Sequence, residues 1–198
     1  MSLNALIRDA EGGRGIETVG REVGLAADEA DRLTELLAPA IGKAVRKRAE
    51  RGETERALTP MLGEDKAGFF DRPAEAASVA GQAQGQAFLE EILGSRDATR
   101  SLASAASERT GIDLGIVERF LPAIAAMLQG GLQKRMPDET LRGMMGGRAG
   151  GLLGGVMGML GGLRRGGGGS DLGPLLALLD RDGDGSALDD VLEGLFRR

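Results

Sequence analysis

The sequence predicts an all-α protein. Through most of the first 140 residues, apolar residues recur every three or four positions, the spacing of one face of a helix. Glycines follow several of these runs, as they do where helices end, and we place helix ends at Gly24, Gly94 and Gly111. A pattern of glycine, an apolar residue, a turn and a helix with Pro-Ala-Ile occurs twice. This recurrence predicts two related helix–turn–helix units.

The composition restricts the chemistry that the chain can perform. It has 198 residues, a formal net charge of −5 and no His, Cys, Tyr or Trp. Without His and Cys the commonest general base and all thiol chemistry are missing, so we predict that the protein is not an enzyme. The mild acidity gives no general attraction to nucleic acid or to anionic membranes. The N-terminal MSLNALIRDAEGG has no long apolar core of a secretion signal, and we expect a cytoplasmic location.

The first helical unit and an irregular connector are predicted to span residues 1–82. Short helices are expected over residues 2–10 and 16–23, separated by glycines. A longer helix should begin near Asp28 and end in a basic run close to residue 52. Pro39 lies within it and should kink it, because proline removes a backbone donor and clashes with the preceding turn.

The connector after residue 52 includes TPMLGEDKAGFFDRP (59–73), whose two prolines and two glycines break regular structure. Phe69 and Phe70 are expected to anchor it on the core. The second unit is predicted to span 83–141, with a helix over Gln84–Leu93 and a second one over Ala98–Arg109, capped by Ser95 or Asp97.

The internal repeat rests on two stretches, VGLAADEADRLTELLAPAI (23–41) and TGIDLGIVERFLPAI (110–124). The distance from the turn glycine to the proline differs by four residues between them, about one helical turn, so the same apolar face is kept. The alternative is that amphipathic helical hairpins resemble one another without common origin.

Three stretches together resemble the bacterial YidB-like family, which is also designated family 937 of the domains of unknown function. They are GRGIETVGREVGLAADEADRLTELLAPAI, FLEEILGSRDATRSLASAASERTGIDLGIVERFLPAIAAMLQGGL and LLDRDGDGSALDDVLEGL. The resemblance covers most of residues 1–140 and the C-terminal tail. It implies an all-α, homeodomain-like arrangement of helices and no established activity.

A DNA-binding regulator is one alternative function, because helix–turn–helix units read DNA in many proteins. We do not favour it, since the first turns of the second helices carry acidic residues such as Asp28, Glu29 and Asp113, which repel phosphate. The cations that could serve it lie in the basic run 43–56: Lys43, Arg46, Lys47, Arg48 and Arg51. The simpler interpretation is a solvated helix end that complements the helix dipole.

Residues 142–170 form a segment rich in Gly, Met and Leu. Glycines four residues apart create a smooth helical face on which two backbones can approach closely. We predict a packed helix over about 149–163, a linker over 166–170 and a homo-oligomer held by Gly147, Gly151, Gly155, Met157, Gly158 and Leu160. A flexible linker throughout is the alternative. The uncharged stretch of 15 residues is shorter than the ~20 that span a membrane, which leaves peripheral membrane binding through 149–163 as another function.

The tail, residues 171–198, contains DRDGDGSALDDV. Aspartates occupy positions one, three and five of an EF-hand-like calcium loop, and a glycine occupies position six, where the chain must turn sharply. Position twelve is Val191 in place of the usual Glu, so Asp190 must close the site and binding should be weak. The predicted ligands of Ca²⁺, with Mg²⁺ as the alternative ion, are Asp180, Asp182, Asp184, Ser186 through its carbonyl, and Asp190. A helix cap formed by Ser186 and Asp189 is the alternative without a metal.

Taken together, these features predict a non-enzymatic interaction or assembly protein that self-associates and binds Ca²⁺ weakly through a helix–loop–helix tail. The sequence does not identify a pathway or a protein partner.

Overall fold

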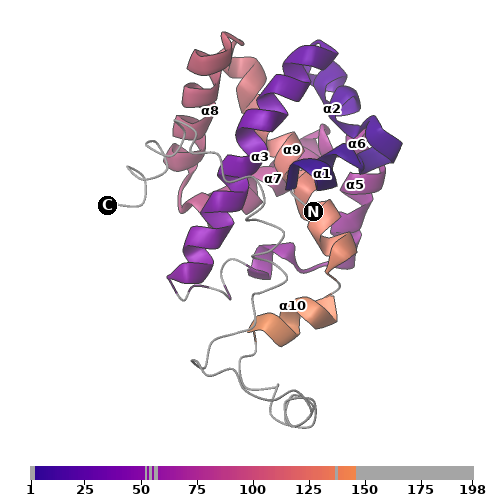
Figure 1. Ribbon diagram of the computed structural model, residues 1–198, viewed down its shortest axis with the longest axis vertical. Coiled ribbons are helices and arrows are strands. Elements are labelled where there is room, and N and C mark those ends of the chain that lie inside the picture. The colour runs from indigo at the N-terminus through magenta and orange to yellow at the C-terminus, as the bar shows by residue number, and fades with distance from the viewer. Residues whose placement is uncertain (1–2, 52, 54, 56–57, 137, 146–198) are drawn as a thin grey trace, which may run out of the picture.

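The computed structural model describes residues 3–51, 53, 55, 58–136 and 138–145, and every regular element in these ranges is a helix (Figure 1). The prediction of an all-α protein is therefore confirmed for the described part of the chain.

The helices follow one another with short connections. The N-terminal elements are α1 (Leu3–Arg8), the 3₁₀ helix η1 (Ala10–Gly13), α2 (Gly15–Val23) and α3 (Ala27–Glu50). The connector contains η2 (Thr59–Met61), η3 (Glu64–Ala67), α5 (Gly68–Asp71) and α6 (Pro73–Ala76). The last four elements are α7 (Val79–Leu93), α8 (Arg96–Thr110), α9 (Leu114–Arg135) and α10 (Asp138–Met145).

The long helix α9 lies at the centre, with α1, α2, α3, α5, α6, α7 and α8 packed around it (Figure 1). No charged residue occurs between Arg119 and Lys134, and every residue from Phe120 to Gln133 is buried. A helix that is uncharged all round can be surrounded by other helices, whereas a helix with a charged face must keep that face in water. The core built around α9 is continuous and includes residues from Leu6 to Leu141.

Glycines allow the backbones of neighbouring helices to touch α9. A Cβ atom added at Gly85 of α7 would lie 1.8 Å from the carbonyl oxygen of Pro122. A Cβ atom at Gly130 of α9 would lie 2.4 Å from the carbonyl oxygen of Lys66 in η3. Any side chain at either position would push the two segments apart.

The turns before α3 and α9 have similar chemistry. Gly24 and Gly111 end α2 and α8 with φ of 91° and 73°, a left-handed conformation that glycine adopts without strain. Each is followed by a buried apolar residue, Leu25 or Ile112. The two hairpins touch each other directly, because Arg119 of α9 donates a hydrogen bond to the carbonyl of Val23 at 3.3 Å.

The start of one predicted helix differs from the structure. Helix α7 begins at Val79, five residues before the predicted Gln84, because the Ser78 side chain accepts a hydrogen bond from the Gly81 N–H and caps the helix. Helix α3 includes Pro39 and ends at Glu50, close to the predicted end near residue 52, and the kink expected at Pro39 stays a prediction. In the connector, Phe70 is buried and Phe69 packs against the core, as predicted.

Candidate functional site

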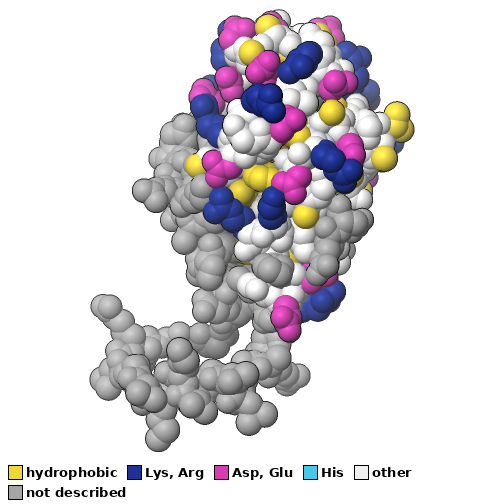
Figure 2. All heavy atoms as spheres, turned by 90° about the vertical axis from the view of Figure 1, so that its right-hand side faces the viewer, with side chains coloured by type: hydrophobic (Ala, Val, Ile, Leu, Met, Phe, Trp, Pro, Cys, Tyr) yellow, Lys and Arg dark blue, Asp and Glu magenta, His cyan; other side chains and the backbone are white. Residues whose placement is uncertain are grey.

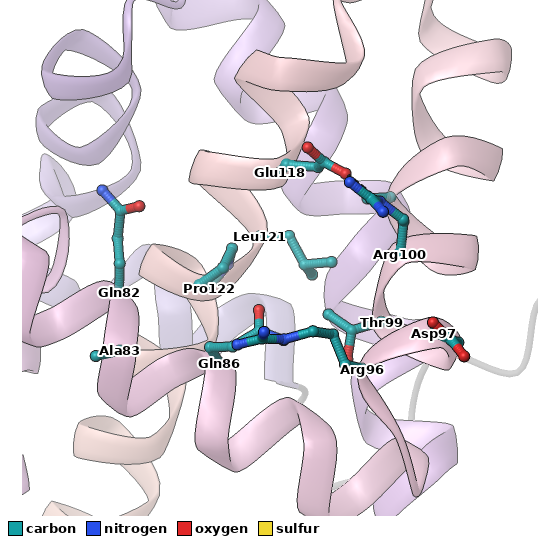
Figure 3. A pocket seen from close by; sticks show the side chains of 11 residues that line it. Gln82, Ala83, Gln86, Arg96, Asp97, Thr99, Arg100, Glu118, Leu121 and Pro122 are labelled. Atoms are coloured by element: carbon teal, nitrogen blue, oxygen red, sulfur yellow. Dashed lines mark hydrogen bonds and ion pairs between the residues drawn. The ribbon is translucent and has the colours of Figure 1, made fainter.

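A groove of about 510 Å³ lies between α7, α8 and α9 (Figure 3). Its lining is shared by the three helices: Gln82, Ala83 and Gln86 from α7, Arg96, Asp97, Thr99, Arg100 and Ala103 from α8, and Glu118, Leu121 and Pro122 from α9. Leu121 and Pro122 lie between the polar groups, and Asp97 points away from them. The groove therefore combines an apolar base with arginine and glutamine side chains at its edges.

Local structure places the two arginines on one side of α8. Ser95 follows the glycine that ends α7, and its side chain accepts a hydrogen bond from the Ala98 N–H at 3.1 Å, which starts α8. Arg96 and Arg100 are one turn apart and therefore lie on the same side of the helix. Gln82 and Gln86 have the same spacing on α7.

One edge of the groove is organised around Glu90 at the end of α7. Its Oε1 accepts hydrogen bonds from Gln86 Nε2 at 2.8 Å and from Arg96 Nε at 3.0 Å. The pKa of Glu90 lies below its usual value, chiefly because of the Gln86 hydrogen bond; desolvation opposes this, and the hydrogen bond and charge of Arg96 add smaller lowering effects. Glu90 is thus a carboxylate near neutral pH, and it fixes the direction of Arg96.

The other edge is an ion pair between α8 and α9. Arg100 Nε donates to Glu118 Oε1 at 3.0 Å, and the two side chains point toward one another (Figure 3). The side chains of Arg96 and Arg100 are 80% and 74% exposed, so each pair contributes less than about 1 kcal/mol and exchanges partners easily. Both arginines use only Nε, and their terminal nitrogens have no hydrogen-bond partner in the described part of the chain.

The arrangement is suited to binding. Its arginines pair with the carboxylates of Glu90 and Glu118, and the Thr99 hydroxyl donates to the Ser95 carbonyl at 3.3 Å. Two oriented guanidinium groups beside an apolar base match a ligand that carries both carboxylates and apolar side chains.

The predicted metal and self-association residues lie outside the described residues. The first set comprises Asp180, Asp182, Asp184, Ser186 and Asp190, and the second comprises Gly147, Gly151, Gly155, Met157, Gly158 and Leu160. Within the ranges that the structure describes, no three His, Cys, Asp or Glu side chains lie close enough together to hold a metal ion.

The basic run after residue 43 is partly engaged in contacts within the fold. Arg48, whose side chain is 11% exposed, donates from Nε to the Ile92 carbonyl at 2.9 Å and pairs with Glu53. Arg46 lies 3.9 Å from Glu50 one turn along α3. Arg48 thus fastens the end of α3 to the end of α7 and is not directed to a phosphate backbone.

The surface of the described part carries mixed charge. Figure 2 shows Lys and Arg side chains interspersed with Asp and Glu on the face that it presents. None of the helices described here combines the length and apolarity needed to cross a bilayer.

Sequence reasoning missed the groove. The available signal was weak: Arg96 and Arg100 follow the Ser95 cap at helical spacing, and Gln82 and Gln86 repeat that spacing on the preceding helix. Only the packing of both helices on α9 brings these four residues together.

Comparisons with known proteins identify a family and nothing more specific. The family described as "Bacterial protein of unknown function (DUF937)" matches residues 5–135. No curated protein and no solved structure matches the chain.

Proposed function

We propose a function from the premise that the chain belongs to the family of bacterial proteins of unknown function (DUF937), which matches residues 5–135. The protein is a cytoplasmic, non-enzymatic interaction or assembly protein. Its body consists of two homeodomain-like helix–turn–helix repeat units, it self-associates through the Gly/Met/Leu segment, and its EF-hand-like tail binds Ca²⁺ weakly.

The observation that supports self-association is the way in which the body uses glycines four residues apart. In α7, added Cβ atoms at Gly81 and Gly85 would lie 2.3 Å from the Glu75 carbonyl oxygen and 1.8 Å from that of Pro122. Glycines at this spacing therefore face neighbouring backbones in this chain. Gly147, Gly151 and Gly155 repeat the spacing beside Met157 and Leu160, which supports a second close helix contact, made between subunits.

Light scattering after size exclusion tests this proposal on the full chain. Gly151→Leu and Gly155→Leu should shift the protein toward the monomer, because the larger side chains separate the two backbones. Gly168→Leu, in the GGGG stretch at 166–169, is the matched control and should leave the oligomer unchanged. A wild-type monomer, or an oligomer indifferent to all three changes, would refute self-association through this segment.

The support for calcium binding is electrostatic. Three aspartates at alternate positions, Asp180, Asp182 and Asp184, repel one another unless a cation lies between them. Calorimetric titration should give heat with Ca²⁺ that Asp182→Ala abolishes and Asp171→Ala, outside the loop, retains. Without the closing Glu, the affinity should be weaker than the ~10⁻⁷–10⁻⁵ M of cytosolic sensors. No heat with Ca²⁺ or Mg²⁺ at millimolar concentration leaves only the helix cap.

Two further binding experiments on the full chain test the alternative functions. Salt-sensitive retardation of random duplex DNA would favour the regulator that uses the basic run 43–56. Flotation with liposomes would favour a peripheral membrane protein that uses residues 149–163.

A further inference from the structure

We infer that the groove between α7, α8 and α9 binds the acidic C-terminal tail of the same chain, residues 171–198, through the guanidinium groups of Arg96 and Arg100.

The first argument is the hydrogen-bonding state of the two arginines. A guanidinium has five N–H donors, and each of these uses only the one on Nε, to Glu90 or to Glu118. The two guanidinium groups belong to residues one helical turn apart on the same side of α8. The terminal nitrogens, which have no partner among the described residues, form the edge that binds a carboxylate with two parallel hydrogen bonds.

The second argument is charge and side-chain complementarity. Residues 171–198 contain seven carboxylates and three arginines, and their aspartates directly follow the apolar run LLALL at 175–179. The groove has Arg96 and Arg100 at its edges, each paired through Nε alone with one carboxylate, Glu90 or Glu118, and the apolar Leu121 and Pro122 at its base. The N-terminus of α8, a helix of 15 residues, adds a partial positive charge beside Arg96.

The third argument is reach. Residues 146–170 separate the described body from the tail, and 25 residues span up to about 85 Å when extended. Even with the proposed helix over 149–163, about 22 Å long, the remaining ten residues add up to about 34 Å. A compact body of this size has a radius of gyration of only about 14 Å, so the tail can return to this face.

Calcium should oppose this contact. If Asp180, Asp182 and Asp184 coordinate Ca²⁺, their charge is neutralised and they no longer attract the two arginines. This regulatory step rests on the proposed function, whereas the groove contact does not.

The chain has no cysteine, so two can be introduced and spin-labelled specifically in the full-length protein. We choose Ser101→Cys, exposed on α8, and Ala187→Cys in the tail, and measure the distance between the labels by pulsed electron resonance. Without Ca²⁺, a narrow short-distance population is expected. Arg96→Gln with Arg100→Gln should abolish it, because the cations are lost. Arg109→Gln, an exposed arginine of α8 outside the groove, is the control and should retain it.

The outcomes separate the groove contact from the proposed function. A short distance that persists in the Arg96→Gln, Arg100→Gln variant, or that is absent in the wild type, overturns the groove contact even if calorimetry shows Ca²⁺ binding. A short distance that requires both arginines but ignores saturating Ca²⁺ supports the groove contact and overturns its regulation. Excess unlabelled chain should change nothing. If it removes the signal, the occupant is the tail of a second copy and the intramolecular contact is overturned.

Discussion

The α2–α3 and α8–α9 hairpins begin alike, yet only the second sends its long helix through the centre of the molecule. When their Pro-Ala-Ile sequences are aligned, Leu37 and Ile41 of α3 correspond to Phe120 and Ile124 of α9, and all four are 0% exposed. Beyond the isoleucine the helices diverge. Lys43, Arg46, Lys47 and Arg48 of α3 correspond to Ala126, Gln129, Gly130 and Gly131 of α9.

This divergence explains the positions of the two helices. A lysine or arginine can enter a core only with a partner and at a large desolvation cost, so one side of the end of α3 must stay near water. The end of α9 has small and uncharged residues in the same places, and other helices close around it. The residues after the shared sequence therefore decide which helix is central.

Ala126→Lys gives α9 the residue found at position 43 of α3. Of the changes considered, it should destabilise the protein most. It should lower the free energy of unfolding by about 4 kcal/mol or more, because an unpaired ammonium group would be buried where Ala126 is 0% exposed. Urea unfolding measures the loss. The reciprocal Lys43→Ala should change stability by less than about 1 kcal/mol. Similar costs for both changes would mean that charge does not determine which helix is central.

Gly85→Ala tests the contact that seats α7 on α9. The added Cβ atom would lie 1.8 Å from the Pro122 carbonyl oxygen, a backbone atom that cannot rotate away. We expect a loss of about 3 kcal/mol in the free energy of unfolding. Gly115→Ala is the comparison: its Cβ atom meets only Asp113 Oδ1, the atom that caps α9, at 3.1 Å, so its cost should not exceed the about 1 kcal/mol of that cap. A stable Gly85→Ala protein would show that the two helices have room to separate.

Much of the fold follows from local signals in the sequence. Gly24, Ser95 and Gly111 act through their own backbone or side chain within a few residues, so helix ends there were predictable. The start of α7 was not predictable from such signals. Gly81 and Gly85 lower the helix propensity of this stretch, and they favour the structure only because a second backbone packs closely against each of them.

The groove depends even more on distant contacts. Arg96 and Glu118 are unremarkable surface residues in the sequence, and they line the same groove only because α7 and α8 both pack on α9. The position of α7 beside the groove depends on its close contact with α9 at Gly85, which no local pattern encodes. The predicted calcium and self-association residues after position 146 remain predictions.

The N-terminal caps of α3 and α9 should contribute less to stability than the core contacts above, and they should contribute unequally. The Asp113 side chain accepts a hydrogen bond from the Ile116 N–H at 3.2 Å at the start of α9, so Asp113→Ala should cost about 1 kcal/mol. Helix α3 instead has Glu29, whose carboxylate accepts from the Ala26 N–H at 3.0 Å. Glu29→Ala should cost about half as much, because the Ala26 N–H that it accepts from precedes the helix, whereas the Ile116 N–H belongs to the first turn of α9. Thermal unfolding of both variants checks the order, and a larger effect of Glu29 would reverse the comparison.

The ends of the two helices also differ, and the end of α9 should make stability depend on pH. Arg48 fastens α3, whereas the end of α9 is tied to α10 by Asp138, whose Oδ1 accepts from Gly63 N at 3.1 Å and Gln133 Nε2 at 2.6 Å. The Gly63 hydrogen bond, with smaller contributions from Gln133 and Arg142, lowers the pKa of Asp138 despite desolvation.

Because the folded pKa of Asp138 is lower than the unfolded value of about 3.9, folding favours the carboxylate, and its stabilising effect is complete above about pH 5. The stabilisation decreases as the pH falls below the unfolded pKa. It is absent below the folded pKa, because Asp138 is then protonated in both the folded and the unfolded state. Asp138→Asn should therefore be less stable than the wild type at pH 7, and the difference should shrink toward pH 3 in urea unfolding. A difference that stays constant over this range would mean that the charge of Asp138 does not stabilise the end of α9 and that the residue acts by its shape alone.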